Sequence, residues 1–207
     1  ELLREMFGAI GEGCYIEPPL HSNWGGRHVH FGKNVYANFH LTLVDDGHIY
    51  VGDAVMFGPN VTVATAGHPV EPQLRSRGVQ YNLDVHIGNN VIIGANSLVN
   101  KDIPDNCVAA GNPCKVIMSL EEYHEKRKAA QVDEAKELVM LYREHYGKEP
   151  DEHALHEFFW LFTDGNDELP ECWDNMMRLG GNYEYSKEKL RKNQKKFLNM
   201  KDFLKNV

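Results

Sequence analysis

The chain has 207 residues, 42% of them hydrophobic and 25% charged, and a formal net charge of −8 at pH 7. These values are ordinary for a globular protein of one or two domains, and the negative charge argues against a general nucleic-acid binder. The longest apolar stretch, residues 91–99, is much shorter than the roughly 20 residues that span a bilayer. No signal peptide is visible. We therefore expect a cytoplasmic protein that binds no membrane and no nucleic acid.

A repeat of six residues runs through the first 117 positions, with one interruption. Its leading residue is apolar, Gly often follows at once, and a second apolar or small residue stands four places on. The leading positions hold Phe31, Ala37, Leu43, Val51, Phe57, Val63, Ile87, Ile93 and Val99, and the fourth places after them hold Val35, Leu41, Val55, Val61, Val91 and Ser97. Ile10 and Ile16 open the pattern irregularly. A helix needs apolar spacings of three and four, and a hairpin strand alternates, so the period predicts neither.

Six residues suffice for one short strand and one corner, and three such units close a triangular coil. The leading residue and the one four places on are expected to fill the interior. Gly and the asparagines three places after the leading residue are expected to accommodate the corner's dihedrals, including positive φ. Those asparagines are Asn34, Asn60, Asn90 and Asn96. Stacked coils pair their backbones with each other, so the sequence predicts a mainly β fold, a parallel β-helix over residues 1–117.

Residues 64–86 interrupt the repeat with prolines, glycines and charged side chains. A long insertion in a tight solenoid is usually functional, so we expect this loop to carry part of a site.

The remainder, residues 118–207, predicts a small α-helical C-terminal domain. Ser119 and Glu122 form a capping-box pattern, and apolar residues at helical spacing follow as far as Gly147. Asp151 is expected to cap a second helix that carries Leu155 and Phe162. Shorter helices are predicted around residues 171–179, 186–195 and 201–206.

Four segments of the repeat region are similar to a known family: IEPPLHSNWG, NVYANFHLTLVDDGHIYVGD, GPNVTVATAGHP and VAAGNPCKVI. They resemble the maltose/galactoside O-acetyltransferases, which are left-handed β-helix hexapeptide-repeat acyltransferases. The resemblance covers roughly residues 2–117. It implies a left-handed coil, a homotrimer with active sites between subunits, and transfer of an acetyl group from acetyl-coenzyme A to a sugar hydroxyl.

The resemblance also implies a catalytic role for His68, the histidine of the AGHP segment, as general base. A sugar hydroxyl is a weak nucleophile until its proton is removed. A histidine with an ordinary pKa of roughly 6.5 is largely neutral at pH 7 and can accept that proton.

The family pattern places the acceptor-binding residues at Asn23, Asn38 and Asp46. Capping of the solenoid corners is the alternative role for these three side chains, and Trp24 is either a sugar-stacking or a packing residue. The pattern places the coenzyme A-binding residues at Gly94, Ala95, Asn100, Lys101 and Lys115. A backbone N–H at Gly94 or Ala95 would stabilise an oxyanion, and the lysines would attract phosphates. The alternative for the lysines is an ordinary surface position.

Three departures from the family leave other functions open. The chain starts after the family's N-terminal helical segment, about one coil is missing near Gly94 and Ala95, and the tail lies outside the family pattern. A non-catalytic scaffold or binding protein that has lost part of the coenzyme A groove is therefore the main alternative. A zinc site at His28 and His30 is a weaker alternative, and no metal is otherwise expected.

The cysteines at positions 14, 107, 114 and 172 form no CxxC pair, which predicts reduced thiols.

Overall fold

The computed structural model describes residues 1–166, 168–179 and 182–207 and divides into two compact units, Glu1–Glu125 and Lys126–Val207. The domain boundary expected after residue 117 stays a prediction. In the part of the chain that the structure describes, no helix has the length and apolar character needed to cross a bilayer.

The first unit is a triangular solenoid that follows a short helix, α1 (Leu2–Met6). Its three sides are parallel sheets, which we call faces A, B and C. Face A contains β1 (Ala9–Ile10), β4 (Val29–Phe31), β7 (Ile49–Val51) and β12 (Val85–Ile87). Face B contains β2 (Tyr15–Ile16), β5 (Tyr36–Ala37), β8 (Met56–Phe57), β13 (Ile92–Ile93) and β15 (Cys107–Ala110), with β16 (Lys115–Ser119) antiparallel at its edge. Face C contains β3 (His21–Ser22), β6 (Thr42–Val44), β9 (Thr62–Ala64) and β14 (Leu98–Val99).

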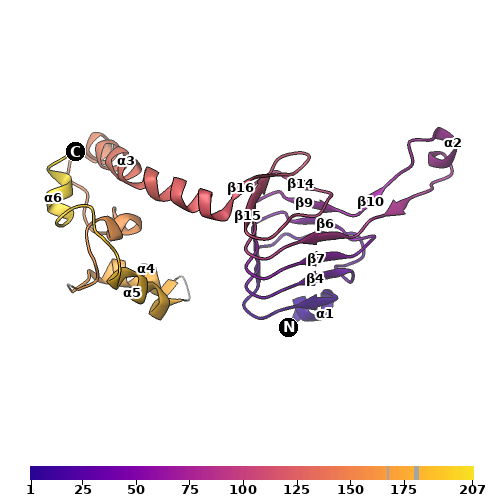
Figure 1. Ribbon diagram of the computed structural model, residues 1–207, viewed down its shortest axis with the longest axis horizontal. Helices are drawn as coiled ribbons and strands as arrows, with labels where there is room; N and C mark the ends of the chain where they lie inside the picture. The colour runs from indigo at the N-terminus through magenta and orange to yellow at the C-terminus, as the bar shows by residue number, and fades with distance from the viewer. Residues whose placement is uncertain (167, 180–181) are drawn as a thin grey trace. The chain divides into compact units, whose positions relative to one another are not determined.

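The chain visits the faces in the order A, B, C, so the coils stack and equivalent residues lie in register (Figure 1). Ala37 pairs with Phe57, for example, and Leu43 with Val63. The strands alternate one residue inward and one outward, as the period-two geometry of a strand requires. Each six-residue unit therefore forms one flat side, and three units close one coil, as predicted.

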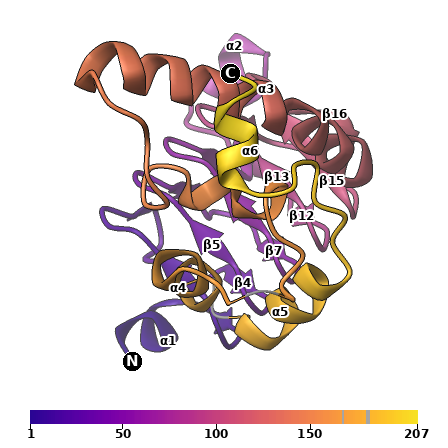
Figure 2. The ribbon, with the colours of Figure 1, turned by 90° about the vertical axis from the view of Figure 1, so that its left-hand side faces the viewer.

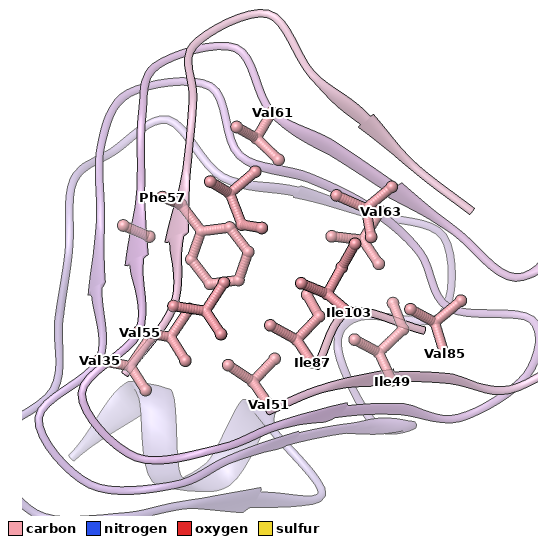
Figure 3. Packing of buried hydrophobic residues seen from close by; sticks show 14 of the residues in the cluster. Val35, Ile49, Val51, Val55, Phe57, Val61, Val63, Val85, Ile87 and Ile103 are labelled. Atoms are coloured by element: carbon pink, nitrogen blue, oxygen red, sulfur yellow. The ribbon is translucent and has the colours of Figure 1, made fainter. Parts of the chain in front are cut away.

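The interior is a column of aliphatic side chains around Phe57 (Figure 3). Every leading residue of the repeat and every residue four places after it is buried, which confirms the predicted core. Ser97 is the polar member of this set. Its hydroxyl donates to Gly94 O at 2.6 Å and accepts from Gly111 N at 3.0 Å, so its burial leaves no unpaired group.

The corners confirm the prediction for asparagine and correct it for glycine. Asn34, Asn60, Asn90 and Asn96 all have φ between 54° and 60°. The repeat glycines that follow the leading residues do not have positive φ. A Cβ on Gly52 would lie 2.7 Å from the carbonyl carbon of Gly88 in the next coil. Glycine is required there because successive coils approach too closely for any side chain.

The interruption in the repeat is a hairpin that leaves the solenoid between β9 and β12 (Figure 1). It contains β10 (Ala66–Gly67), α2 (Pro72–Arg75) and β11 (Tyr81–Asn82), with β10 and β11 antiparallel. At its root, Thr65 donates to Val44 O at 2.7 Å and accepts from Gly47 N at 2.8 Å. The loop is thus tied to the coil below it.

The helical region begins with α3 (Leu120–Tyr146), whose N-terminus has the predicted capping box. Glu122 N donates to Ser119 Oγ, and the Glu122 carboxylate accepts from Ser119 N. The second unit continues with η1 (His156–Leu161), α4 (Glu171–Leu179), α5 (Tyr183–Arg191) and α6 (Met200–Leu204), and α4 packs beside α5 (Figure 2). Its core includes Val139, Leu155, Phe162, Trp173 and Phe203.

The second predicted helix differs from the prediction. Residues His156–Leu161 form a 3₁₀-helix rather than an α-helix, and Asp151 caps the preceding turn, where its carboxylate accepts from Ala154 N at 3.0 Å. Leu155, Phe158 and Leu161 are three residues apart, and that spacing aligns on a 3₁₀-helix. The core of the second unit, which includes Leu155 and Leu161, therefore favours the tighter turn in this segment.

We expect Phe57→Ala to lower the free energy of unfolding by about 3–5 kcal/mol, because it opens a cavity at the centre of the aliphatic column. Met56→Ala is the matched control, since the neighbouring Met56 side chain points outward and is 49% exposed. Its effect should stay within about 0.5 kcal/mol. Urea unfolding followed by circular dichroism measures both, and equal losses would contradict the inward placement of Phe57.

Candidate active site

His68 lies on the exposed hairpin that leaves the solenoid after β9. Its ring Nδ1 is 3.0 Å from the carbonyl oxygen of Val79. A carbonyl can only accept a hydrogen bond, so Nδ1 carries the proton and the lone pair of the neutral ring is at Nε2. The Tyr81 ring covers Gly67, where a Cβ would come within 2.6 Å of it. The backbone at Gly67, next to His68, therefore packs closely against the Tyr81 ring, while His68 itself is exposed.

Asp46 lies at the corner between faces C and A, beside the root of this hairpin. Its Oδ2 accepts from Asn23 Nδ2 at 2.8 Å, and its Oδ1 accepts from Trp24 Nε1 at 3.2 Å and from Gln80 Nε2 at 3.1 Å. The hydrogen bonds from Asn23, Gln80 and Trp24, in that order of effect, lower the pKa of the Asp46 carboxyl. Asp46 is therefore an ionised, oriented acceptor of hydrogen bonds.

The structure thus brings Asn23, Asp46 and the His68 hairpin to one corner, which we call the CA corner. Sequence reasoning did not identify Gln80, which links the hairpin to Asp46. Its position two residues before Asn82 in a polar loop gave no signal, because the contact joins segments that are 34 residues apart.

Asn38 lies at the other end of β6, at the corner between faces B and C, which we call the BC corner. Its Oδ1 accepts from Phe39 N at 2.7 Å, which is the corner-capping role named above as its alternative. Asn38 belongs to the same corner column as Gly94 and Ala95, which lie two coils further on. Asn38 therefore joins the predicted donor residues rather than Asp46.

The predicted coenzyme A residues fall into two groups. Gly94 and Ala95 form the BC corner of the last full coil, and Lys115 lies opposite Ala110 at the end of β15. Gly94 N donates to Ala109 O at 2.8 Å, so this N–H already belongs to the sheet, whereas Ala95 is exposed at the corner. Asn100 and Lys101 are exposed at the CA corner, one strand away.

His28 and His30 belong to a stack of rings on the outside of face A. His30 Nε2 lies 3.0 Å from His48 Nδ1, and the His30 ring stacks on Tyr50 with centroids 4.7 Å apart. Tyr50 stacks in turn on His86 at 4.7 Å. Among the residues that the structure describes, no group of three or more histidine, cysteine or carboxylate side chains is arranged to hold a metal ion. His30 stacks on His48 and Tyr50, and His28 makes tilted ring contacts with His48 and Trp24.

Comparison with known proteins identifies the class. No family model matches the chain. The galactoside O-acetyltransferase of Lactococcus lactis is 56% identical in an alignment of 134 residues that covers 56% of this chain and 65% of the relative. The galactoside O-acetyltransferase of Escherichia coli is 43% identical, and its alignment covers 58% of this chain and 68% of the relative. The chain thus spans slightly less than two thirds of the Lactococcus protein.

Solved structures of the same kind of enzyme are also similar to this chain. A galactoside acetyltransferase in complex with coenzyme A is 42% identical, with a TM-score of 0.50 over 57% of this chain and 68% of the other. A maltose O-acetyltransferase from Clostridium difficile is 39% identical, also with a TM-score of 0.50, over 56% of this chain and 72% of the other. Fold and similarity define a left-handed β-helix built from hexapeptide repeats. The chain belongs to the maltose/galactoside O-acetyltransferase family, which confirms the resemblance seen in the sequence.

The alignments also bear on the missing coil. The alignment with the Lactococcus protein extends over 134 residues but takes in 56% of this chain, about 116 residues. The difference of about 18 residues matches three six-residue sides. This chain is therefore shorter than that relative by about one coil.

Acid should destabilise the first unit partly through His30. Its pKa lies below the ordinary value of 6.5 because of burial and because of the neighbouring rings of His48 and His28. As the pH falls below about 6.5, the unfolded chain binds this proton before the folded chain does, so stability falls. His30→Phe keeps a ring against Tyr50 but cannot be protonated. We expect this variant to lose less unfolding free energy between pH 7 and pH 5 in urea titrations, and an unchanged loss would contradict the assignment.

Proposed function

We propose that this chain transfers an acetyl group from acetyl-coenzyme A to a hydroxyl group of a sugar or sugar-like acceptor, with His68 as general base. The observation that carries the proposal is the exposed His68 ring, whose proton is held at Nδ1 by the Val79 carbonyl. This leaves Nε2 free, on a hairpin anchored to an ionised Asp46. Family membership supports the reaction class.

The residues at the CA corner suit a polyhydroxyl acceptor. The Nε2 lone pair of His68 takes the proton of the attacking hydroxyl, and the Val79 carbonyl stabilises the charge that forms on the ring. The Asp46 carboxylate accepts a hydrogen bond from a second hydroxyl. The Trp24 indole, half exposed beside Asp46, offers an apolar surface to a sugar ring.

Acetyl-coenzyme A supplies an acyl group activated as a thioester. The residues at the BC corner fit such a donor. The N–H of Ala95, an exposed residue, is the better oxyanion donor of the predicted pair, because the Gly94 N–H is already bonded to Ala109. The ammonium group of Lys115, exposed at the same corner, suits a phosphate.

A homotrimer, which the family resemblance implies, is part of the proposal. Within one chain the acceptor group and the Ala95 group lie at opposite ends of the face C strands, separated by strands of up to three residues. A general base must lie within hydrogen-bond reach of the hydroxyl that attacks the thioester. A site composed of the CA corner of one copy and the BC corner of the next satisfies this requirement. A cytoplasmic location stays a prediction, supported by the cytoplasmic supply of acetyl-coenzyme A.

The missing coil supports a second candidate function, that of a non-catalytic scaffold or binding protein that has lost part of the coenzyme A groove. Titration calorimetry with coenzyme A separates the two. Binding in the micromolar range supports the acetyltransferase, and absence of binding at millimolar coenzyme A favours the scaffold.

We expect His68→Ala to lower kcat by roughly 10²- to 10⁴-fold, because the proton acceptor is lost while the exposed position leaves the fold intact. His124→Ala, an exposed histidine of α3, is the control and should keep the original rate. A thiol-release assay with acetyl-coenzyme A and a panel of sugars measures both. Turnover near that of the unaltered protein in His68→Ala would refute the assignment.

Lys115→Ala should raise the KM for acetyl-coenzyme A about five- to tenfold and leave kcat and the acceptor KM nearly unchanged, because an exposed ion pair contributes about 1 kcal/mol. Lys33→Ala removes an exposed lysine from the corner between faces A and B and serves as the control for net charge. An equal rise in KM for both variants would show a general effect of charge instead of a contact at Lys115.

A further inference from the structure

Gln80 is the hairpin residue that joins the solenoid at the acceptor corner. Its side-chain amide nitrogen donates to Asp46 Oδ1 at 3.1 Å and to Asn82 Oδ1 at 2.8 Å. Asn82 Nδ2 in turn donates to the backbone carbonyl of Asp46 at 3.3 Å. Both N–H groups of the Gln80 side chain thus donate hydrogen bonds. The hairpin contacts both the carboxylate of Asp46, through Gln80, and its backbone carbonyl, through Asn82.

The number of hydrogen bonds that Asp46 accepts limits what else it can bind. An ionised carboxylate offers about four lone-pair positions, two on each oxygen. Oδ1 already accepts from Trp24 and Gln80, and Oδ2 accepts from Asn23. One position remains, on Oδ2. The carboxylate therefore has room for one hydroxyl group and not for a pair of neighbouring hydroxyls bound to both oxygens.

We propose that Gln80 is a positioning and specificity-determining residue, which fills Asp46 Oδ1 so that the carboxylate binds a single acceptor hydroxyl through Oδ2. This inference rests on the proposed function for its consequence in catalysis. The clasp itself, Gln80 bound to Asp46, is a property of the folded chain with or without an acceptor.

Gln80 also connects the acceptor corner to the base. Its backbone nitrogen belongs to the same peptide group as the Val79 carbonyl, which holds Nδ1 of His68. Anchoring the Gln80 side chain therefore restrains the carbonyl that fixes the His68 ring. The same clasp orients the carboxylate that binds the acceptor and the histidine that deprotonates it.

Gln80→Met tests the proposal, because methionine has a similar length and cannot donate a hydrogen bond. Gln80 is exposed, so the fold should persist. The pKa of the Asp46 carboxyl, followed by ¹³C NMR, should rise toward its ordinary value. The acceptor KM should rise about five- to tenfold while the KM for acetyl-coenzyme A stays unchanged. Gln80→Lys keeps a donor within reach of Asp46 and should keep the Asp46 pKa low.

Gln73→Met is the matched control, since it makes the same change on α2 of the same hairpin. It should alter neither quantity. An unchanged Asp46 pKa in Gln80→Met would overturn the clasp. A raised pKa with an unchanged acceptor KM, and with an unchanged ratio of kcat/KM between acceptors with and without neighbouring hydroxyls, would overturn its role in positioning and specificity. If the unaltered protein acetylates no sugar, the proposed function fails, and the NMR titration still decides whether Gln80 holds Asp46.

Discussion

The close stacking of one coil on the next is the constraint on which the rest of the structure depends. At the corner between faces A and B, Gly11, Gly32, Gly52 and Gly88 lie so near the next coil that a Cβ would come within 2.8 Å of it. The short strands then pair with their neighbours above and below, as in the bond from Met56 N to Val91 O at 2.9 Å. With every coil held at this spacing, the aliphatic column inside and the corner columns outside are aligned along the solenoid axis.

That alignment explains how strands of two or three residues can hold a site. Each corner occurs once per coil, so residues far apart in the chain project side by side along one edge. The CA corner gathers Asn23 from the first coil and Asp46 from the second, and the hairpin with His68 leaves from the third. A rigid edge with one long hairpin gives both a fixed carboxylate and an exposed base. The side chains that bind are on corners and loops, and the scaffold that positions them is the packed interior.

The number of coils in the solenoid also affects the proposed coenzyme A-binding part of the site. This chain is shorter than its Lactococcus relative by about one coil. The family pattern in the sequence sets this departure near Gly94 and Ala95, at the BC corner. The last full coil is followed directly by β15 and the antiparallel β16, which close face B. Asn23, Asp46 and the root of the His68 hairpin all lie in the remaining coils. The BC corner is therefore the part of the proposed site that the missing coil concerns.

The sequence by itself determined the solenoid, because a six-residue period leaves few ways to bury its apolar residues. It correctly gave the buried columns through Val63 and Val99, the positive φ at Asn60 and Asn90, and the capping box at Ser119. It also gave His68 as the candidate base, through a short motif in the one insertion. Tertiary structure alone decided the rest. The corner glycines serve close packing between coils, which no local pattern reveals, and residues 156–161 form a 3₁₀-helix because of the core around them. The partners of Asp46 come from two separate segments, Asn23–Trp24 and the hairpin around Gln80, and their meeting at one corner depends on how the coils stack.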